Sequence, residues 1–252
     1  MPLRHLERYN TSPNLRRRLG SRAERDFLEL NSMTVSGLED DFQGDTLSGT
    51  YQSTASGTNA LAAAISTGVV NGAILLDAGD ANAGRCDLSW GRHYQGQLNP
   101  VYIARLSINT LTTRKFEIGF TDVISGTDAG AVSTKATPAF NATDCAVLVY
   151  DTDDDALLTL VGNSNGSAAT ADDFSIALAT GYYYFGVAII GTGAHGFVLD
   201  ANGYLLETAE ITSAITTDVL LTPWLFVQNR AANAGTMTVD WHRAYQRRTT
   251  TD

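Results

Sequence analysis

Hydrophobic and polar residues alternate with a period of two along most of the chain, which is the spacing of a β-strand with one buried face. The segment 101–108 (VYIARLSI) predicts one such strand. In the segment 115–121 (KFEIGFT) every second residue is apolar, which predicts another. We expect a hairpin turn at Thr112-Thr113 to join the two strands.

Three further segments show strand or hairpin patterns. The segment 145–150 is almost continuously apolar, and 182–190 is apolar on both faces, as in the middle of a covered sheet. The segment 197–206 predicts a hairpin in which Asn202-Gly203 supplies the positive φ of the turn.

The segments 224–227 (WLFV) and 237–241 (MTVDW) predict the last pair of strands. In the second segment Met237, Val239 and Trp241 are expected to share one face. The next residue, His242, then falls on the outward face. We therefore expect Val239 to be buried in a core and His242 to lie on the surface.

These patterns predict an all-β fold: an antiparallel β-sandwich over residues 40–246, because two stacked sheets bury that much alternating surface. Residues 1–39 are predicted to form an N-terminal arm, with a short amphipathic helix and a linker at 31–41. Residues 247–252 are predicted to be a C-terminal tail.

The arm differs from the rest of the chain in both hydrophobic period and charge. Its apolar residues recur every four positions, which indicates a helix. Residues 1–30 contain seven Arg and four Asp or Glu, whereas residues 31–252 contain ten Lys or Arg and 23 Asp or Glu. We expect this helix to dock on an acidic partner, although the same charges would allow it to fold back on its own sandwich. The predicted partner-binding residues are Leu15, Arg17, Arg18, Leu19, Arg25, Phe27 and Leu30.

The net charge of −10 argues against nucleic acid as a partner, because phosphate would be repelled by the acidic body. No apolar run reaches about 18 residues, so no membrane span is expected. The N-terminal sequence MPLRHLERYN lacks the apolar core of a signal peptide, which predicts a protein that stays in the cytosol where it is made. Cys86 and Cys145 are expected to be free thiols, with a single bridge as the alternative.

The body resembles concanavalin A-like (laminin-G-like) jelly rolls. The resemblance is carried by Asp40-Asp41-Phe42 with Gly44-Asp45, by the segment 70–79 (VNGAILLDAG), by the sheet pair around 101–121, and by the order in which the 197–206 hairpin and the closing segment 223–245 follow.

The Ala-, Thr- and Gly-rich composition is similar to that of virion proteins of tailed bacteriophages. This resemblance implies a structural protein of the particle, as a head-decoration, head-fibre or tail component. Its partners would be major capsid or tail proteins, and it would be found in the virion after assembly in the host bacterial cytoplasm. Trimers are common at capsid three-fold positions, although no heptad or repeat in this chain requires a homo-oligomer.

Concanavalin A-like jelly rolls also include glucanases. The resemblance implies that an enzyme of this kind would cut sugars with a strand of the pattern Glu-x-Asp-x-(x)-Glu. Retaining cleavage needs two carboxylates about 5–5.5 Å apart. No strand of this chain has that pattern, and Glu117 is the only acidic residue on its strand. We therefore predict that the protein is not an enzyme.

We predict no metal and no cofactor. The acidic run 151–155 (DTDDD) could hold Ca²⁺, but charge runs are usually solvated turns. The four histidines have no metal-ligand spacing. The glycines of 191–196 (GTGAHG) precede a strand, so no helix N-terminus is available for phosphate.

Sugar binding is the alternative function, as a carbohydrate-binding module that serves host or surface attachment. Trp90, Tyr94 and Tyr102 lie near a polar loop with Arg92 and Asn99, and such rings could stack on a pyranose. The alternative for these aromatic residues is packing in a core or at its rim.

Overall fold

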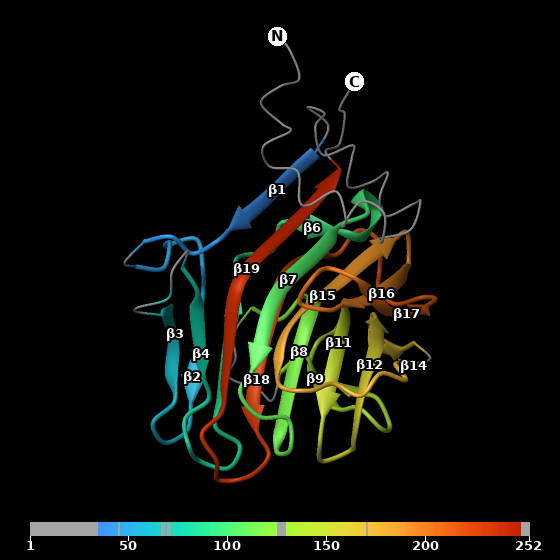
Figure 1. Cartoon of the computed structure of the whole chain (residues 1–252). Helices are drawn as coiled ribbons and strands as arrows, with labels where there is room; N and C mark the ends of the chain where they lie inside the picture. The colour runs from blue at the N-terminus through green and yellow to red at the C-terminus, as the bar shows by residue number, and fades with distance from the viewer. Residues whose placement is uncertain are drawn as a thin grey trace.

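The computed structural model describes residues 35–44, 46–66, 69, 72–124, 130–169 and 171–247. Within these residues the chain forms two antiparallel sheets that face each other across an apolar core (Figure 1). The only regular helix among them is one 3₁₀ turn at Gly96–Leu98. None of the helices described is long and apolar enough to span a bilayer. The predicted antiparallel sandwich is therefore confirmed, whereas the helical arm lies outside the described residues.

Sheet A contains both the first and the last strand of the described chain. It runs in the order β17 (Leu205–Ile211), β16 (Gly193–Leu199), β15 (Gly181–Ile190), β7 (Val101–Ile108), β19 (Thr236–Arg247), β4 (Ile74–Asp77) and β3 (Leu61–Ile65). In addition, β1 (Val35–Asp40) pairs with the C-terminal half of β19.

Sheet B packs behind sheet A in the view of Figure 1. It runs in the order β13 (Ser167–Ala168), β12 (Asp155–Ser164), β11 (Cys145–Asp151), β8 (Arg114–Thr121), β18 (Leu220–Asn229), β5 (Arg85–Ser89) and β2 (Ala55–Ser56). The short strands β14 (Asp172–Asp173) and β6 (Tyr94–Gln95) pair with β12 and β18. A separate hairpin is formed by β9 (Val132–Thr134) and β10 (Ala139–Phe140).

The expected hairpin at Thr112-Thr113 and the expected pairing of the last two strands are both wrong. β7 belongs to sheet A and β8 to sheet B, so the turn at Thr112-Thr113 connects the two sheets. β18 and β19 are likewise in different sheets. Each connection places consecutive strands on opposite sides of the core, as a jelly roll requires. The 197–206 hairpin is confirmed as β16–β17, with Gly203 at φ 80° in its turn.

The linker expected over residues 31–41 is in part a strand. Residues 35–40 form β1, whose Leu38 pairs with Ala244 of β19 and packs against the main core. The short pattern VSGLED contains a single large apolar residue at its centre, so its pairing depends on the neighbouring strand more than on its own sequence. The sandwich therefore includes residues 35–40, which the sequence had assigned to the arm and linker.

The face assignment on β19 is wrong after Val239. The register between β19 and β7 shifts between Val239 and Trp241, which is a bulge at Asp240. Because side chains alternate along a strand, the extra residue exchanges the two faces. Met237 and Val239 are buried in the core, Trp241 points outward, and His242 is fully buried.

Candidate functional site

The outer face of sheet B is where the acidic residues of a glucanase-like strand would lie. On β8, Phe116, Ile118 and Phe120 belong to the core between the sheets. Lys115, Glu117 and Gly119 alternate with them and face away from that core. The strand thus offers one carboxylate, as the sequence predicted, and it places a lysine beside it.

Glu117 is fully buried and accepts hydrogen bonds from several directions. Its carboxylate oxygens lie 3.0 Å from Nζ of Lys115 and 2.9 Å from Nε1 of Trp224. They also accept the backbone N–H groups of Ala131, at 2.7 Å, and of Val132, at 3.1 Å. Lys115 Nζ in turn donates to the Val132 carbonyl. Glu117 and Lys115 therefore fasten a neighbouring segment to the sheet.

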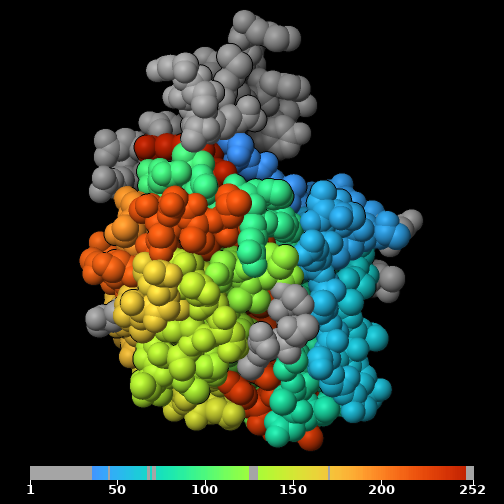
Figure 2. Space-filling view, turned by 180° about the vertical axis from the view of Figure 1, so that it is seen from behind, coloured from blue at the N-terminus to red at the C-terminus, as the bar shows by residue number. Residues whose placement is uncertain are grey.

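That segment, residues 130–142, is called the covering segment below, and it includes the β9–β10 hairpin. Its residues Ala131, Val132 and Ala142 form a second apolar cluster with the outward side chains of β11 and β12. Seen from behind, the side chains over this part of the molecule carry the yellow-green of residues around 130–150 (Figure 2). Trp224 and Phe226, which stack with ring centroids 6.1 Å apart, are fully buried on this face.

Asp87 on β5 is a second carboxylate on the same face of sheet B as Glu117. In the register of sheet B, Phe226 lies between the two residues, so they are two strands, or about 9.6 Å, apart. Burial raises the pKa of Asp87 to about 6, and its oxygens accept the backbone N–H and the hydroxyl of Thr54. The separation exceeds that of retaining glycosidases. The Phe226 ring fills the space that an inverting enzyme needs for substrate and water.

The acidic run 151–155 forms a tight turn whose carboxylates have protein partners. Arg230 donates to both oxygens of Asp151. Asp154 accepts the backbone N–H of Lys135 at 2.6 Å, and the ammonium of Lys135 pairs with Asp155. Within the described ranges no group of three or more His, Cys, Asp or Glu residues could hold a metal ion.

The candidate sugar-stacking residues Trp90, Tyr94 and Tyr102 are buried, with exposed fractions of 4%, 4% and 0%. Trp90 and Tyr102 pack edge to face with ring centroids 5.4 Å apart. The packing alternative is therefore confirmed, and these rings are not available to a ligand. Trp90 and Tyr102 pack edge to face against His242, with ring centroids 4.5 and 6.1 Å from that of the histidine.

His242 takes part in a buried hydrogen-bonded chain that the sequence did not indicate. Tyr51 donates its hydroxyl proton to Asp40 at 2.8 Å and lies 2.7 Å from Nε2 of His242. Because the tyrosine has only one proton, Nε2 must be the protonated nitrogen. Burial lowers the pKa of His242 to about 3. The chain joins β1 to β19 through a neutral histidine.

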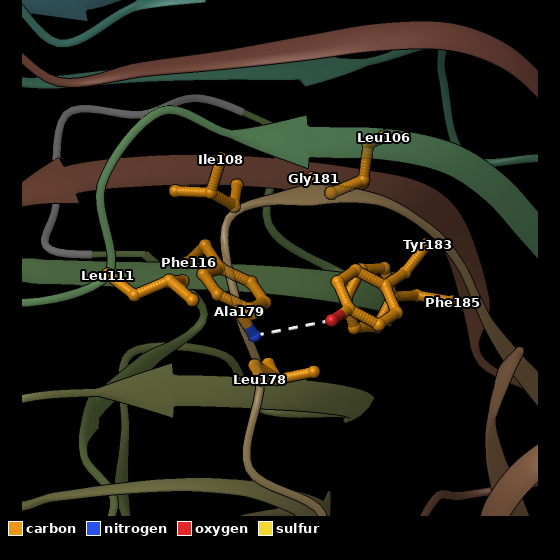
Figure 3. Close-up of a pocket in the computed structure, with 9 residues that line it drawn as sticks. All are labelled: Leu106, Ile108, Leu111, Phe116, Leu178, Ala179, Gly181, Tyr183 and Phe185. Atoms are coloured by element: carbon orange, nitrogen blue, oxygen red, sulfur yellow. Dashed lines mark hydrogen bonds between the residues drawn. The ribbon is translucent and has the colours of Figure 1, made fainter. Parts of the chain in front are cut away.

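A small pocket opens between the sheets (Figure 3). It is lined by Leu106, Ile108, Leu111, Phe116, Leu178, Ala179, Gly181, Tyr183 and Phe185. Its empty volume of about 190 Å³ is below the usual range of ligand pockets. The hydroxyl of Tyr183 faces it but accepts the Ala179 N–H at 3.2 Å. This pocket suits no sugar.

The predicted partner-binding residues, Leu15, Arg17, Arg18, Leu19, Arg25, Phe27 and Leu30, lie outside the described residues. Cys86 and Cys145 are both buried and free, as expected. Sequence reasoning missed the partners of Glu117. The proximity of Lys115 to Glu117 can be predicted from the sequence, because residues two positions apart on a strand lie on the same face. The contact with Trp224 cannot, because that residue is 107 positions away.

No family model matches the chain, and no curated protein matches it. Solved structures do match. A protein of unknown function from Shewanella oneidensis MR-1 has a TM-score of 0.62 and 12% identity, covering 96% of this chain and 99% of that chain. A Bacillus licheniformis β-glucanase has a TM-score of 0.55 and 15% identity, covering 84% and 98%.

Binding proteins have the same fold. The Emp47p carbohydrate recognition domain matches with a TM-score of 0.55 and 11% identity, covering 86% of this chain and 98% of that chain. The CBM2 module of the evolved Dit of Lactobacillus casei BL23 phage J-1 matches with a TM-score of 0.51 and 12% identity, covering 87% and 99%. At these identities the likeness shows the fold, which is the lectin and glucanase jelly roll.

Proposed function

We propose that this protein binds carbohydrate and does not cleave it. The observation that carries the proposal is the state of Glu117, whose carboxylate is buried, paired with Lys115 and used to hold the covering segment. A glycosidase needs two carboxyl groups that reach the substrate. The fold is shared with a carbohydrate recognition domain, which supports carbohydrate binding. It is shared equally with a β-glucanase, so the choice between binding and hydrolysis rests on Glu117.

Lys115 supports the same proposal. A general acid in a glycosidase must hold a proton near neutral pH and release it to the leaving oxygen. Both carboxylate oxygens of Glu117 already accept hydrogen bonds, from Lys115, Trp224 and the backbone of the covering segment, so neither is placed to pass a proton to a substrate. On this strand the chemistry therefore stabilises the fold instead of acting on a substrate.

The test is a glycan array probed with the full chain, followed by a reducing-sugar assay on each glycan that binds. We expect binding to at least one glycan class and no release of reducing ends. Release of reducing sugar that disappears in Glu117→Gln would contradict the proposal, as would the absence of binding on a broad array.

A second proposal concerns where the protein works. We infer that it is a component of a bacteriophage particle, held there by residues 1–30. The resemblance in composition to virion proteins and the shared fold with a module of a phage Dit support this. The charge reversal between residues 1–30 and the acidic body supports docking through the arm.

Deletion of residues 1–30 tests this second proposal. The truncated protein should fold but should no longer be incorporated into particles. Incorporation of the full chain should weaken as salt increases, because exposed ion pairs are screened over about 8–10 Å at physiological ionic strength. Normal occupancy of the truncated protein on particles would rule out the docking arm.

A further inference from the structure

The outer face of sheet A lies toward the viewer in Figure 1. The register of its strands places a row of aromatic and charged residues on this face. In the register of the sheet, Trp241 of β19 lies opposite Arg105 of β7, which in turn lies opposite Tyr184 of β15. Tyr182 follows on the same face of β15. These side chains alternate with core residues such as Leu106 and Phe185 and therefore face outward.

The rings are partly exposed and are held in place. The indole N–H of Trp241 donates to Glu39 at 3.0 Å, and the Trp241 and Tyr184 rings meet edge to face with centroids 6.4 Å apart. The guanidinium of Arg105 lies 4.3 Å above the Tyr182 ring and bonds Asp240 at 2.5 Å. A surface whose side chains are already fixed loses little conformational entropy when a ligand binds.

A small apolar cluster on the outer face of sheet A supports this row. Ile103, Phe197 and Leu199 are buried there, and Tyr184 and Trp241 pack against them. Gly186 lies beneath the Phe197 ring, and a Cβ at this position would come within 2.1 Å of that ring. Because glycine has no side chain, the Phe197 ring can lie against the backbone at Gly186. The cluster thereby supports the partly exposed rings of Tyr184 and Trp241.

We propose that this row, called the outer platform (Tyr182, Tyr184, Trp241, Arg105 and Asp240), binds an uncharged pyranose chain. The inference rests on the proposed carbohydrate-binding function and gives it a site. A pyranose has an apolar C–H face, which packs on an aromatic ring, and hydroxyl groups at its edge, which exchange hydrogen bonds with carboxylate and guanidinium groups.

The charges favour an uncharged ligand. Arg105 pairs with Asp240, and Arg243 lies 3.5 Å from Glu39, so the two cations around the platform each have an anion. A charged sugar would have to break one of these pairs. A protein partner is less suited, because a stable interface buries about 800 Å² on each side. The large hydrophobic side chains that are most exposed, Leu61, Tyr204, Leu220 and Leu206, all lie outside the row and do not extend it.

The opposite face of the sandwich cannot take this role in the described structure. Trp224 and Phe226 on sheet B are fully buried, and the covering segment is bonded to Glu117. A sugar could reach those rings only if these hydrogen bonds broke. The outer platform needs no such change.

The experiment starts from a neutral glycan that the full-length parent protein binds on the array, with its affinity measured by calorimetry. Trp241→Ala and Tyr184→Ala should each weaken binding by about tenfold or more, since each removes a stacking partner. Tyr204→Ala is the matched control, because it removes an exposed aromatic ring from the connection between β16 and β17, outside the platform. It should bind like the parent.

A second measurement uses the unaltered protein. The chain has three tryptophans, and Trp90 and Trp224 are 4% and 0% exposed, so acrylamide should quench mainly Trp241. Saturating glycan should protect Trp241 and remove this quenching.

Unchanged quenching, or parent-like affinity of both platform variants, would overturn the platform and leave the proposed function in place. A parent protein that binds no glycan would overturn both.

Discussion

Replacing His242 by phenylalanine should remove an acid sensitivity that this residue gives to the fold. His242 is fully buried between the rings of Phe42 and Trp90, with centroids 4.9 and 4.5 Å away. Its Nε2–H faces the Tyr51 hydroxyl, and among the described residues its Nδ1 has no hydrogen-bond partner. Protonation would therefore place a charge and an unpaired N–H in the core.

The magnitude follows from the pKa. An ordinary histidine has a pKa of 6.5, and burial lowers that of His242 to about 3. Since the folded-state pKa is depressed, the stability from the neutral form is present above pH 6.5 and is lost as the pH falls towards 3. The full loss is about 5 kcal/mol, and about 3 kcal/mol of it falls between pH 7 and pH 4.

Protonation of Asp87 changes the stability of the fold in the opposite direction, so its contribution must be removed from the comparison. Its pKa is raised to about 6 by burial, so its protonation in the same pH range stabilises the fold. Comparison of the parent with His242→Phe removes this contribution, because Asp87 is present in both proteins.

The assay is urea unfolding of both proteins at pH 7 and pH 4. Between pH 7 and pH 4 the free energy of unfolding of the parent should fall by about 3 kcal/mol more than that of the variant. His195→Gln is the control, because the His195 side chain is 38% exposed. The stability of this variant should depend on pH in the same way as that of the parent. Parallel pH dependence of the parent and His242→Phe would refute the reasoning.

Three further substitutions test the sandwich itself. Val239→Asp, which places an unpaired charge at a position with 0% exposure, should lower the free energy of unfolding by more than about 3 kcal/mol in urea titrations, and a variant as stable as the parent would show that this face is not buried. Glu117→Gln should cost about 3–5 kcal/mol because it removes the carboxylate charge from a fully buried ion pair, whereas Glu117→Gln combined with Lys115→Met should recover most of that loss in the same assay. Gly203→Ala, at φ 80°, should cost about 1 kcal/mol in thermal unfolding, and no loss would mean that the turn does not need a left-handed residue.

The sequence was sufficient for those elements whose signals are local. The strand at 101–108 follows from alternation, the strand predicted at 182–190 follows from its apolar run, and the β16–β17 hairpin follows from one turn. The assignment of strands to sheets was not predictable in the same way, since a connection that crosses between sheets at 109–113 has the same composition as a hairpin turn. The bulge at Asp240 adds one residue without changing the pattern of apolar residues, which is why His242 was placed on the wrong face.

The candidate sites were less predictable than the strands. Glu117 was visible as a single acidic residue, but its role depends on backbone groups of the covering segment 14 and 15 residues away. The outer platform combines β7, β15 and β19, and its ion pair joins Arg105 to Asp240, 135 positions away. Tyr182 and Tyr184 were read as parts of a covered strand, because nothing in the sequence shows which face of a strand its sheet leaves open.

Native mass spectrometry of the full chain, mixed with an uncharged oligosaccharide that it binds on the array, tests binding without cleavage most directly. The account predicts a complex whose mass equals that of the protein plus the intact oligosaccharide, unchanged after prolonged incubation. A complex that contains shortened oligosaccharide, or the absence of any complex with the ligand, would contradict it.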